Sequence, residues 1–273
     1  MPLGNLGKNV SKSLADLVKG AGEIGGQAIE ATRSNLVDAL RGTRDATKEA
    51  SGLAGDAVTG AIHAASDVGG ELGSAAKGAV VGAIRGVGEV TTVTTGVVSD
   101  TIRAAVKGTS EIGADVNKAA RGAAEGAVAT AKGIGLSAED AASSVARGAI
   151  QGGKEVGGDL GAVAKSTIEG TIGATKEIGG DVMSATRATA RELVKTTAEV
   201  GGDLASVAHK AVEGAIGGAK EVAVNVEEAA SAAATGAAEA AQEIGGSAID
   251  TVTKAVSGTI SGVKVVVKTP FQK

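Results

Sequence analysis

The chain has 273 residues, of which 44 are glycine, only one, Phe271, is aromatic, and none is cysteine. The lack of cysteine excludes disulfides and thiolate metal sites, and a net charge of −4 with interspersed signs gives no basic footprint for nucleic acid. The apolar stretches are too short to span a bilayer, and the first residues lack the apolar region of a signal peptide. We therefore expect a cytoplasmic protein without a transmembrane span, either free or peripheral on a membrane or lipid body.

Most of the chain is one tandem repeat. Residues 1–22 form a degenerate N-terminal repeat, residues 23–264 form eleven repeats of 22 residues without insertion or deletion, and residues 265–273 form a C-terminal tail. The clearest copies read EVGGDLGAVAKSTIEGTIGATK from Glu155 and EVGGDLASVAHKAVEGAIGGAK from Glu199. A period held this strictly indicates one supersecondary unit repeated to make length.

The spacing of apolar residues predicts helix throughout the repeats. Twenty-two residues are two elevens, and eleven residues make about three turns at 3.67 residues per turn, so an apolar stripe stays on one side of the helix. Repeat position 2 is Ile or Val in ten of the eleven repeats, and position 18 is Leu, Ile or Val in ten. The predicted apolar contact face, for lipid or for another copy, consists of Ile24, Ile62, Val68, Ile84, Val90, Ile112, Ile150, Val156, Ile172, Ile178, Val194, Val200, Ile216, Val222, Ile244 and Ile260.

The predicted fold is all-α, a very long amphipathic helix of 11/22-residue (hendecad) periodicity rather than a compact globular domain. With so few large side chains, a compact core is not expected. Such helices could associate as a right-handed coiled coil. Alternatively, the chain could bend near the middle into a long hairpin, because Gly133 and Gly135 followed by Ser137 resemble a helix stop and a new N-cap. The unbroken repeat phase favours a continuous helix over this possible hinge.

Glycine recurs at two repeat positions, the third and the sixteenth, in eight repeats each. One interpretation is close approach between helices, as in small-xxx-small packing. The other is that amplification copied a flexible unit in which nothing selects glycine.

The sequence contains no pattern that predicts catalysis. His63 and His209 are 146 positions apart, without neighbouring ligands, and are expected to be solvated. The acidic residues at position 1 recur every 22 residues as a stripe and not as a pair. We expect a protein that is not an enzyme and that holds no cofactor and no metal.

Segments such as GAVVGAIRGVGEVTTVTTGVV and KSTIEGTIGATKEIGGDV resemble the eleven-residue repeats of synucleins and perilipins and, more distantly, of late-embryogenesis-abundant proteins. The resemblance covers the eleven repeats and rests on period and composition. The KTKEGV-type core of the synucleins is absent. The resemblance implies a chain that is disordered in water and becomes a long helix on lipid.

Three functions remain open from the sequence. The first is a non-catalytic structural protein whose repeated helix coats a lipid or other apolar surface. The second is a self-assembling hendecad coiled coil or filament, in which the partners are copies of the chain. The third is a stress or desiccation protectant that is disordered in water.

Overall fold

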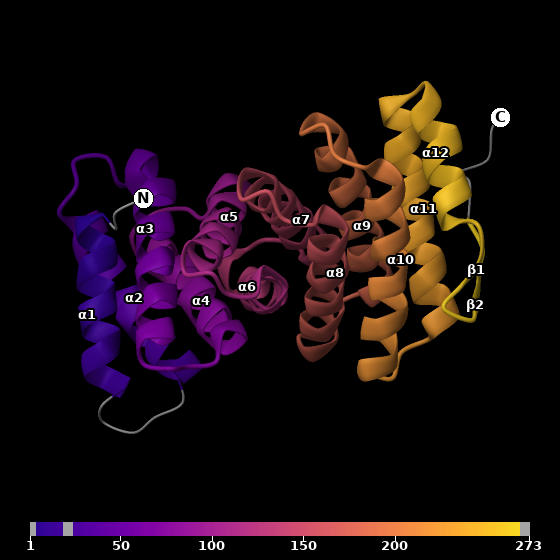
Figure 1. Cartoon of the computed structure of the whole chain (residues 1–273). Helices are drawn as coiled ribbons and strands as arrows, with labels where there is room; N and C mark the ends of the chain where they lie inside the picture. The colour runs from indigo at the N-terminus through magenta and orange to yellow at the C-terminus, as the bar shows by residue number, and fades with distance from the viewer. Residues whose placement is uncertain (1–3, 19–23, 268–273) are drawn as a thin grey trace.

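The computed structural model describes residues 4–18 and 24–267, and nearly all of them lie in short helices connected by tight turns (Figure 1). The elements are α1 (Asn5–Val18), α2 (Ile24–Arg41), α3 (Ala46–Asp67), α4 (Leu72–Val90), α5 (Thr95–Glu111), α6 (Val116–Thr130), a 3₁₀ turn (Ala131–Ile134), α7 (Ala138–Glu155), α8 (Leu160–Glu177), α9 (Val182–Glu199), α10 (Leu204–Glu221), α11 (Val226–Ile244), α12 (Ser247–Val256), β1 (Gly258–Ile260) and β2 (Val263–Val265).

The predicted single long helix is therefore wrong, and so are the hendecad coiled coil and the non-globular shape. In the most regular part of the chain, each 22-residue repeat is one helix of 18 residues followed by a turn of four. Twenty-two residues of continuous helix would make about six turns. A repeat of helix plus turn has the same period, so the spacing of the apolar residues does not distinguish the two arrangements.

The turns are made by the motif that joins the repeats, Glu-Val-Gly-Gly-Asp. At the end of α7, Gly157 adopts a left-handed conformation with φ of 68°, and the Gly158 amide donates to the Gly153 carbonyl at 2.8 Å. This is a Schellman cap. The Asp159 carboxylate then accepts hydrogen bonds from the amides of Gly161 and Ala162 and caps the start of α8. Glycine at repeat position 3 therefore ends a helix, and aspartate at position 5 begins the next.

The possible hinge near the middle is one such turn among many. Gly135 is left-handed with φ of 76°, and the Ser137 hydroxyl accepts from the Asp140 amide at 3.0 Å. The helix stop and the N-cap that the sequence indicated are both present. Gly133 lies in the preceding 3₁₀ turn. The chain nevertheless turns after each helix and does not fold into two long arms.

The helices pack in two layers, because each helix lies mainly against the second helix along the chain. The even-numbered helices α2 to α12 form one layer and the odd-numbered helices α1 to α11 form the other. Figure 1 shows this stack running from the indigo N-terminal helices to the yellow C-terminal ones. The architecture is an α-helical solenoid whose structural unit is 44 residues, two helices with their turns.

Small side chains fill the core between the layers. Alanine supplies many of the fully buried positions, together with the branched side chains of repeat position 18. Large side chains are not needed because glycine allows the helices to approach closely. In a solenoid each repeat also packs only against its neighbours, so the core between them is narrow.

The two ends of the stack are covered differently. At the N-terminal end, α1 buries Leu6, Val10 and Leu14 against the stack and exposes Lys8 and Lys12. At the C-terminal end, α12 packs on α10 and α11, and strand β2 of the antiparallel β1–β2 hairpin lies against α11. The terminal repeats therefore differ from the regular ones, as capping repeats do in solenoids.

Candidate functional site

The predicted apolar contact face is divided between two environments. The position 18 side chains Ile62, Ile84, Ile150, Ile172 and Val194 are fully buried between the layers, and Ile216 and Ile260 are nearly so. The position 2 side chains instead lie at helix ends. Those that occupy C-caps are Val68, Ile112, Val156, Ile178, Val200 and Val222.

The remaining members of position 2 also lie at helix ends, since Ile24 begins α2, Val90 ends α4 and Ile244 ends α11. The sixteen residues therefore do not form one continuous surface. Covering lipid with the position 18 side chains would require the two helical layers to separate.

Glycine at repeat position 16 closes neighbouring helices onto each other. A Cβ atom on Gly170 of α8 would lie 2.4 Å from the Arg121 carbonyl oxygen of α6. Real Cβ atoms do not come this close to a backbone oxygen, so only glycine fits. From α6 to α11 the partner lies 49 residues earlier, one 44-residue unit plus five residues, in the pairs Gly126–Lys77, Gly148–Ser99, Gly170–Arg121, Gly214–Lys165 and Gly236–Arg187. Close approach, one of the two interpretations of the sequence, explains this column.

Two repeats break the glycine column within the odd layer, and both exceptions line an open furrow. Position 16 is Ala104 in α5 and Glu192 in α9. Ala104 faces Gly55, which is again 49 residues earlier, and a Cβ atom on Gly55 would lie 3.4 Å from the Ala104 Cβ. Ala104 therefore meets the opposite helix at ordinary contact distance, where glycine elsewhere lets the backbones come closer.

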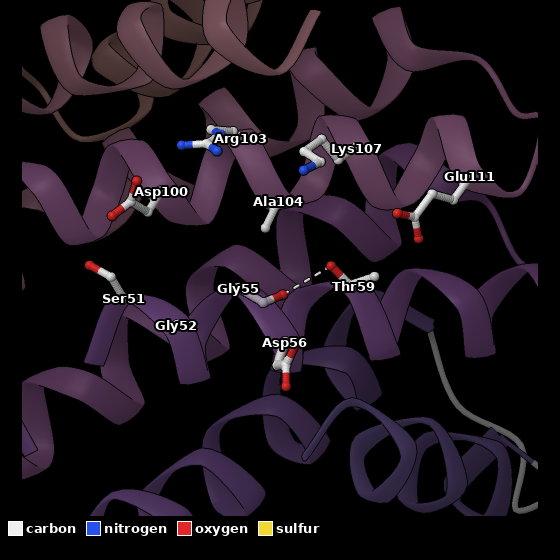
Figure 2. A pocket seen from close by; sticks show the side chains of 10 residues that line it. All are labelled: Ser51, Gly52, Gly55, Asp56, Thr59, Asp100, Arg103, Ala104, Lys107 and Glu111. Atoms are coloured by element: carbon white, nitrogen blue, oxygen red, sulfur yellow. Dashed lines mark hydrogen bonds between the residues drawn. The ribbon is translucent and has the colours of Figure 1, made fainter. Parts of the chain in front are cut away.

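The α3–α5 furrow has a volume of ≈ 340 Å³. It is lined by Ser51, Gly52, Gly55, Asp56, Thr59, Asp100, Arg103, Ala104, Lys107 and Glu111. Figure 2 shows Ser51 and Asp100 pointing toward each other across its open end, whereas Asp56 points away from α5.

Glycine forms the floor of this furrow without a structural need for glycine. Gly52 lies inside α3, and a Cβ atom there would meet nothing within 4 Å. Glycine in a helix interior costs about 1 kcal/mol relative to alanine. Here neither a turn nor a close backbone approach requires it, and its consequence is an unobstructed trough.

Some charged side chains of the furrow have ion-pair partners in the folded chain and others have none. Arg103 Nε lies 2.7 Å and Lys107 Nζ 3.0 Å from the Glu155 carboxylate of α7, so both cations already have a partner. The Asp100 carboxylate, by contrast, has no hydrogen-bond or ion-pair partner within the described ranges 4–18 and 24–267. Asp56 has no such partner in these ranges either, but it points away from α5 (Figure 2), so Asp100 is the unpaired charge that faces the opposite wall of this furrow.

A second furrow lies on the other side of α5. The α5–α7 furrow, with a volume of ≈ 500 Å³, is lined by Thr95, Gly96, Ser99, Asp100, Arg103, Asp140, Ser143, Ser144, Arg147, Gln151 and Glu192. Its Glu192 is the second exception to the glycine column, and Ser143 is the residue 49 positions earlier. The two furrows share Asp100 and Arg103, which therefore stand on the ridge between them.

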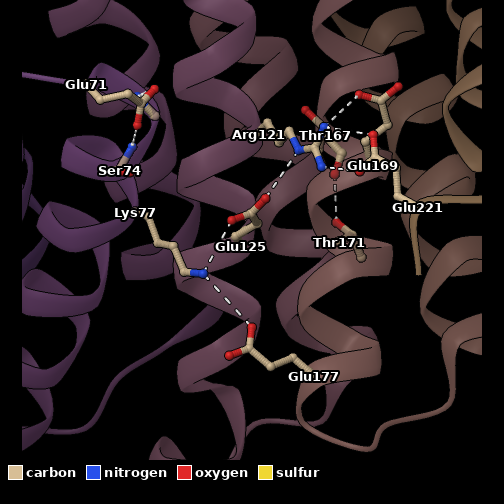
Figure 3. A network of polar contacts seen from close by, with 11 residues as sticks. Glu71, Ser74, Lys77, Arg121, Glu125, Thr167, Glu169, Thr171, Glu177 and Glu221 are labelled. Carbon is tan, nitrogen blue, oxygen red and sulfur yellow. Dashed lines mark hydrogen bonds and ion pairs between the residues drawn. The ribbon is translucent and has the colours of Figure 1, made fainter. Parts of the chain in front are cut away.

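The even layer carries a network of ion pairs that joins successive helices (Figure 3). Arg121 of α6 pairs with Glu125 on its own helix, with Glu169 of α8 at 3.7 Å, and with Glu221 at the end of α10. Lys77 of α4 similarly reaches Glu177 at the end of α8. These pairs join helices of the even layer that have another helix between them.

Burial sets the electrostatics of this network. The Glu169 side chain is only 14% exposed, and burial raises its pKa, although the nearby Arg121 and Lys165 cations act in the opposite direction. The hydrogen bond to Glu221 raises the pKa of Arg121. Glu213 occupies the equivalent position on α10, but there a hydrogen bond from Lys210 lowers the carboxyl pKa. Equivalent carboxylates one unit apart therefore have opposite shifts.

The histidines are less solvated than the sequence led us to expect. His63 Nε2 is buried 3.6 Å from Glu111 Oε2, between α3 and α5. His209 Nδ1 lies 3.1 Å from the Ala255 carbonyl oxygen, and its Nε2 lies 3.4 Å from Glu213. Within residues 4–18 and 24–267, no group of three His, Cys, Asp or Glu side chains is arranged to hold a metal ion.

Sequence reasoning missed the furrow residues, although a signal for them exists. Basic residues at position 11 recur every 44 residues, as Arg33, Lys77, Arg121 and Lys165, and all four lie on even-numbered helices. Arg103, Arg147 and Arg191 follow the same 44-residue spacing on odd-numbered helices. Alignment in rows of 44 would have separated the two layers and exposed Ala104 and Glu192 as exceptions.

None of the helices in the part of the chain that the structure describes has both the length and the apolar character needed to cross a membrane. No family model and no curated protein matches the sequence. Among solved structures, the chain is similar to the de novo designed helical repeat protein DHR7, with 24% sequence identity and a TM-score of 0.40 over 60% of this chain and 92% of that protein.

Proposed function

We propose that this chain is a non-catalytic scaffold that binds segments of a polypeptide partner in the α3–α5 and α5–α7 furrows. The observation that carries the proposal is the glycine floor of the α3–α5 furrow, which lowers helix stability without serving the fold. A position that sacrifices stability to keep a surface trough open is typical of a binding site. Repeat solenoids commonly present extended surfaces to their partners.

The chemistry of the furrow walls favours a polypeptide over a lipid surface. Hydroxyl, carboxylate, guanidinium and ammonium groups line the α3–α5 furrow together with glycine and alanine. A peptide offers both amide hydrogen bonds and side chains to such walls, whereas lipid acyl chains would leave the polar groups without partners. The branched side chains that a lipid coat would use, such as Ile62 and Ile172, are engaged in the core.

End-to-end self-assembly is a weaker explanation of the surface. The outer face of α1 presents polar residues, including Lys8, Asn9 and Lys12. A polar terminal repeat in a solenoid blocks the stacking of another unit. The furrows, in contrast, open along the side of the stack and do not require a second copy.

Selection from a phage-displayed library of random dodecapeptides on the immobilised full chain tests this proposal. Enriched peptides would be synthesised and their affinities measured by fluorescence anisotropy against the unaltered chain, a Gly52→Leu/Gly96→Leu variant and a Gly173→Leu variant. Gly173 is the matched control, because a Cβ atom there also meets nothing within 4 Å but the residue lies on α8, outside the furrows. We expect the furrow variant to lose at least about tenfold in affinity, which is about 1.4 kcal/mol.

Equal affinities for all three proteins would contradict the proposal, as would a library that yields no enriched peptide. Circular dichroism of each variant keeps the comparison valid, since leucine is a strong helix former and a Cβ atom at Gly52, Gly96 or Gly173 would meet nothing closer than 3.6 Å.

A further inference from the structure

The α3–α5 furrow has the shape of a socket for one long side chain. Its volume of ≈ 340 Å³ is small for a folded element but sufficient for a single extended side chain and its water. The floor of Gly52 and Gly55 and the wall of Ala104 offer no side chain beyond a methyl group. An aliphatic stem lying along this floor would contact backbone and methyl surface.

The polar groups at the open end determine which side chain fits. Asp100 and Ser51 point toward each other there, one from each wall (Figure 2). The Asp100 carboxylate has no partner within the described ranges, whereas the neighbouring Arg103 and Lys107 are paired with Glu155. The unmatched charge at the mouth is therefore negative, with a hydroxyl opposite that can accept a further hydrogen bond.

We infer that the α3–α5 furrow binds a lysine or arginine side chain of the partner. Its methylene stem lies on Gly52 and Gly55, and its cationic head is held between Asp100 and Ser51. Lysine and arginine are the side chains that combine a long apolar stem with a charged tip. A charge-assisted hydrogen bond to a carboxylate is stronger than one between neutral groups. This inference rests on the proposed function and adds the anchor residue of the partner.

Asp100 also lines the α5–α7 furrow, where glycine is less dominant. There the walls carry Asp140, Ser143 and Ser144, and the Asp140 carboxylate accepts a hydrogen bond from the Ser137 hydroxyl at 2.8 Å. Arg147 pairs with both Glu192 and Glu199. This furrow therefore offers room for the chain that flanks the anchor, and the unpaired carboxylate stays on the ridge shared with the α3–α5 furrow.

Single amino-acid amides probe the socket without any selected peptide. Nα-acetyl-arginine amide and Nα-acetyl-lysine amide would be titrated into the ¹⁵N-labelled full chain, with Nα-acetyl-glutamine amide as the neutral control. We expect the cationic amides to shift the amide resonances of Ser51, Gly52, Gly55 and Asp100, and we expect the neutral amide to leave them in place. Asp100→Asn should weaken the cationic amides at least about fivefold, because a charge-assisted bond becomes a neutral one.

The matched control is Asp250→Asn, which removes one exposed carboxylate from α12, far along the chain from the furrow. Shifts scattered over acidic surfaces, or weakened equally by Asp100→Asn and Asp250→Asn, would overturn the inference. Peptides that bind the furrows and lose affinity in the Gly52→Leu/Gly96→Leu variant, but not in Asp100→Asn, would overturn the basic anchor and leave the scaffold proposal standing. Binding of the cationic amides in the furrow, without any furrow-binding peptide, would overturn the scaffold proposal and leave the site for a basic side chain standing.

Discussion

The α6–α8 contact in the even layer and the α3–α5 contact in the odd layer have the same register but different separations. In both, the residue at repeat position 16 faces the residue 49 positions earlier. Gly170 lies against the Arg121 backbone so closely that a Cβ atom would be 2.4 Å from its carbonyl oxygen. At the corresponding place in the odd layer, Ala104 faces Gly55 at ordinary contact distance, and a furrow lies beside it.

The difference teaches that one methyl group at position 16 keeps two neighbouring helices at ordinary contact distance, where glycine lets the backbones approach, as it does in the odd layer at Gly148 against Ser99. Where they close in the even layer, Arg121 and Lys77 reach across an intervening helix to carboxylates at the ends of α10 and α8. In the odd layer, Arg103, Arg147 and Arg191 each pair with the glutamate 52 residues later, on the next odd helix. Ion pairs in the even layer thus extend across an intervening helix, whereas these three in the odd layer join neighbouring helices.

The largest expected effect comes from opening the closed contact with Gly170→Ala. The added Cβ has no space beside the Arg121 carbonyl, so α8 must move away from α6. Overpacking of this kind costs about 1–3 kcal/mol, more than the approximately 1 kcal/mol that alanine contributes to helix propensity. We expect a net loss of up to about 2 kcal/mol of stability, measured by urea denaturation followed by circular dichroism.

Gly173→Ala is the matched control on the same helix, three residues further along. Nothing lies within 4 Å of a Cβ atom there, so the alanine should stabilise the chain by about 0.5–1 kcal/mol. Two glycines of one helix should therefore respond with opposite signs. If both alanines stabilise the chain, the close contact does not hold the even layer together.

The helical structure was predicted from the sequence, but the helix boundaries were not. The signals for these boundaries lie in the turn that joins the repeats. Gly157, Gly158 and Asp159 together carry a left-handed cap and an N-cap, a recognisable stop and start. Apolar side chains that recur every 22 residues conceal this signal, since the period is compatible with continuous helix. The same signal was recognised only around Ser137, where the repeat is irregular.

An intermediate effect is expected from closing the open contact with Ala104→Gly. Without its methyl group, α5 can approach α3 as α8 approaches α6, which narrows the furrow around Gly55. The helix-propensity cost of about 1 kcal/mol should be partly offset by the new contact, so we expect a net destabilisation of about 0.5 kcal/mol. A furrow-binding peptide should lose about fivefold in affinity, and fluorescence anisotropy would measure it.

The place of the α3–α5 furrow could have been predicted from the sequence, but its depth and the unpaired carboxylate of Asp100 could not. Ala104 and Glu192 stand out once the sequence is arranged in rows of 44 residues. Which carboxylate lacks a partner depends on where Glu155 meets Arg103 and Lys107, three residues that come together only through the packing of α7 on α5. Such pairings are tertiary and have no local signature.

The smallest expected effect concerns proton binding inside the closed layer. Burial raises the pKa of Glu169 in the folded chain, so the folded state holds its proton more tightly than the unfolded state. This contribution to stability is full below the unfolded pKa of about 4.3 and is lost as pH rises through the folded value. Glu169→Gln should therefore flatten the decrease of stability with rising pH, and at pH 7 it should change stability by less than about 1 kcal/mol.

Glu213→Gln at the equivalent position of α10 should act in the opposite direction. The hydrogen bond from Lys210 lowers the pKa of Glu213, so its contribution is present above the unfolded pKa and is lost as pH falls through the folded value. Urea denaturation of both variants at intervals from pH 3 to pH 7 would compare the two slopes. Similar slopes for Glu169→Gln and Glu213→Gln would show that the even layer solvates both carboxylates alike, and that α6 and α8 are less closed around Glu169 than their glycine contact implies.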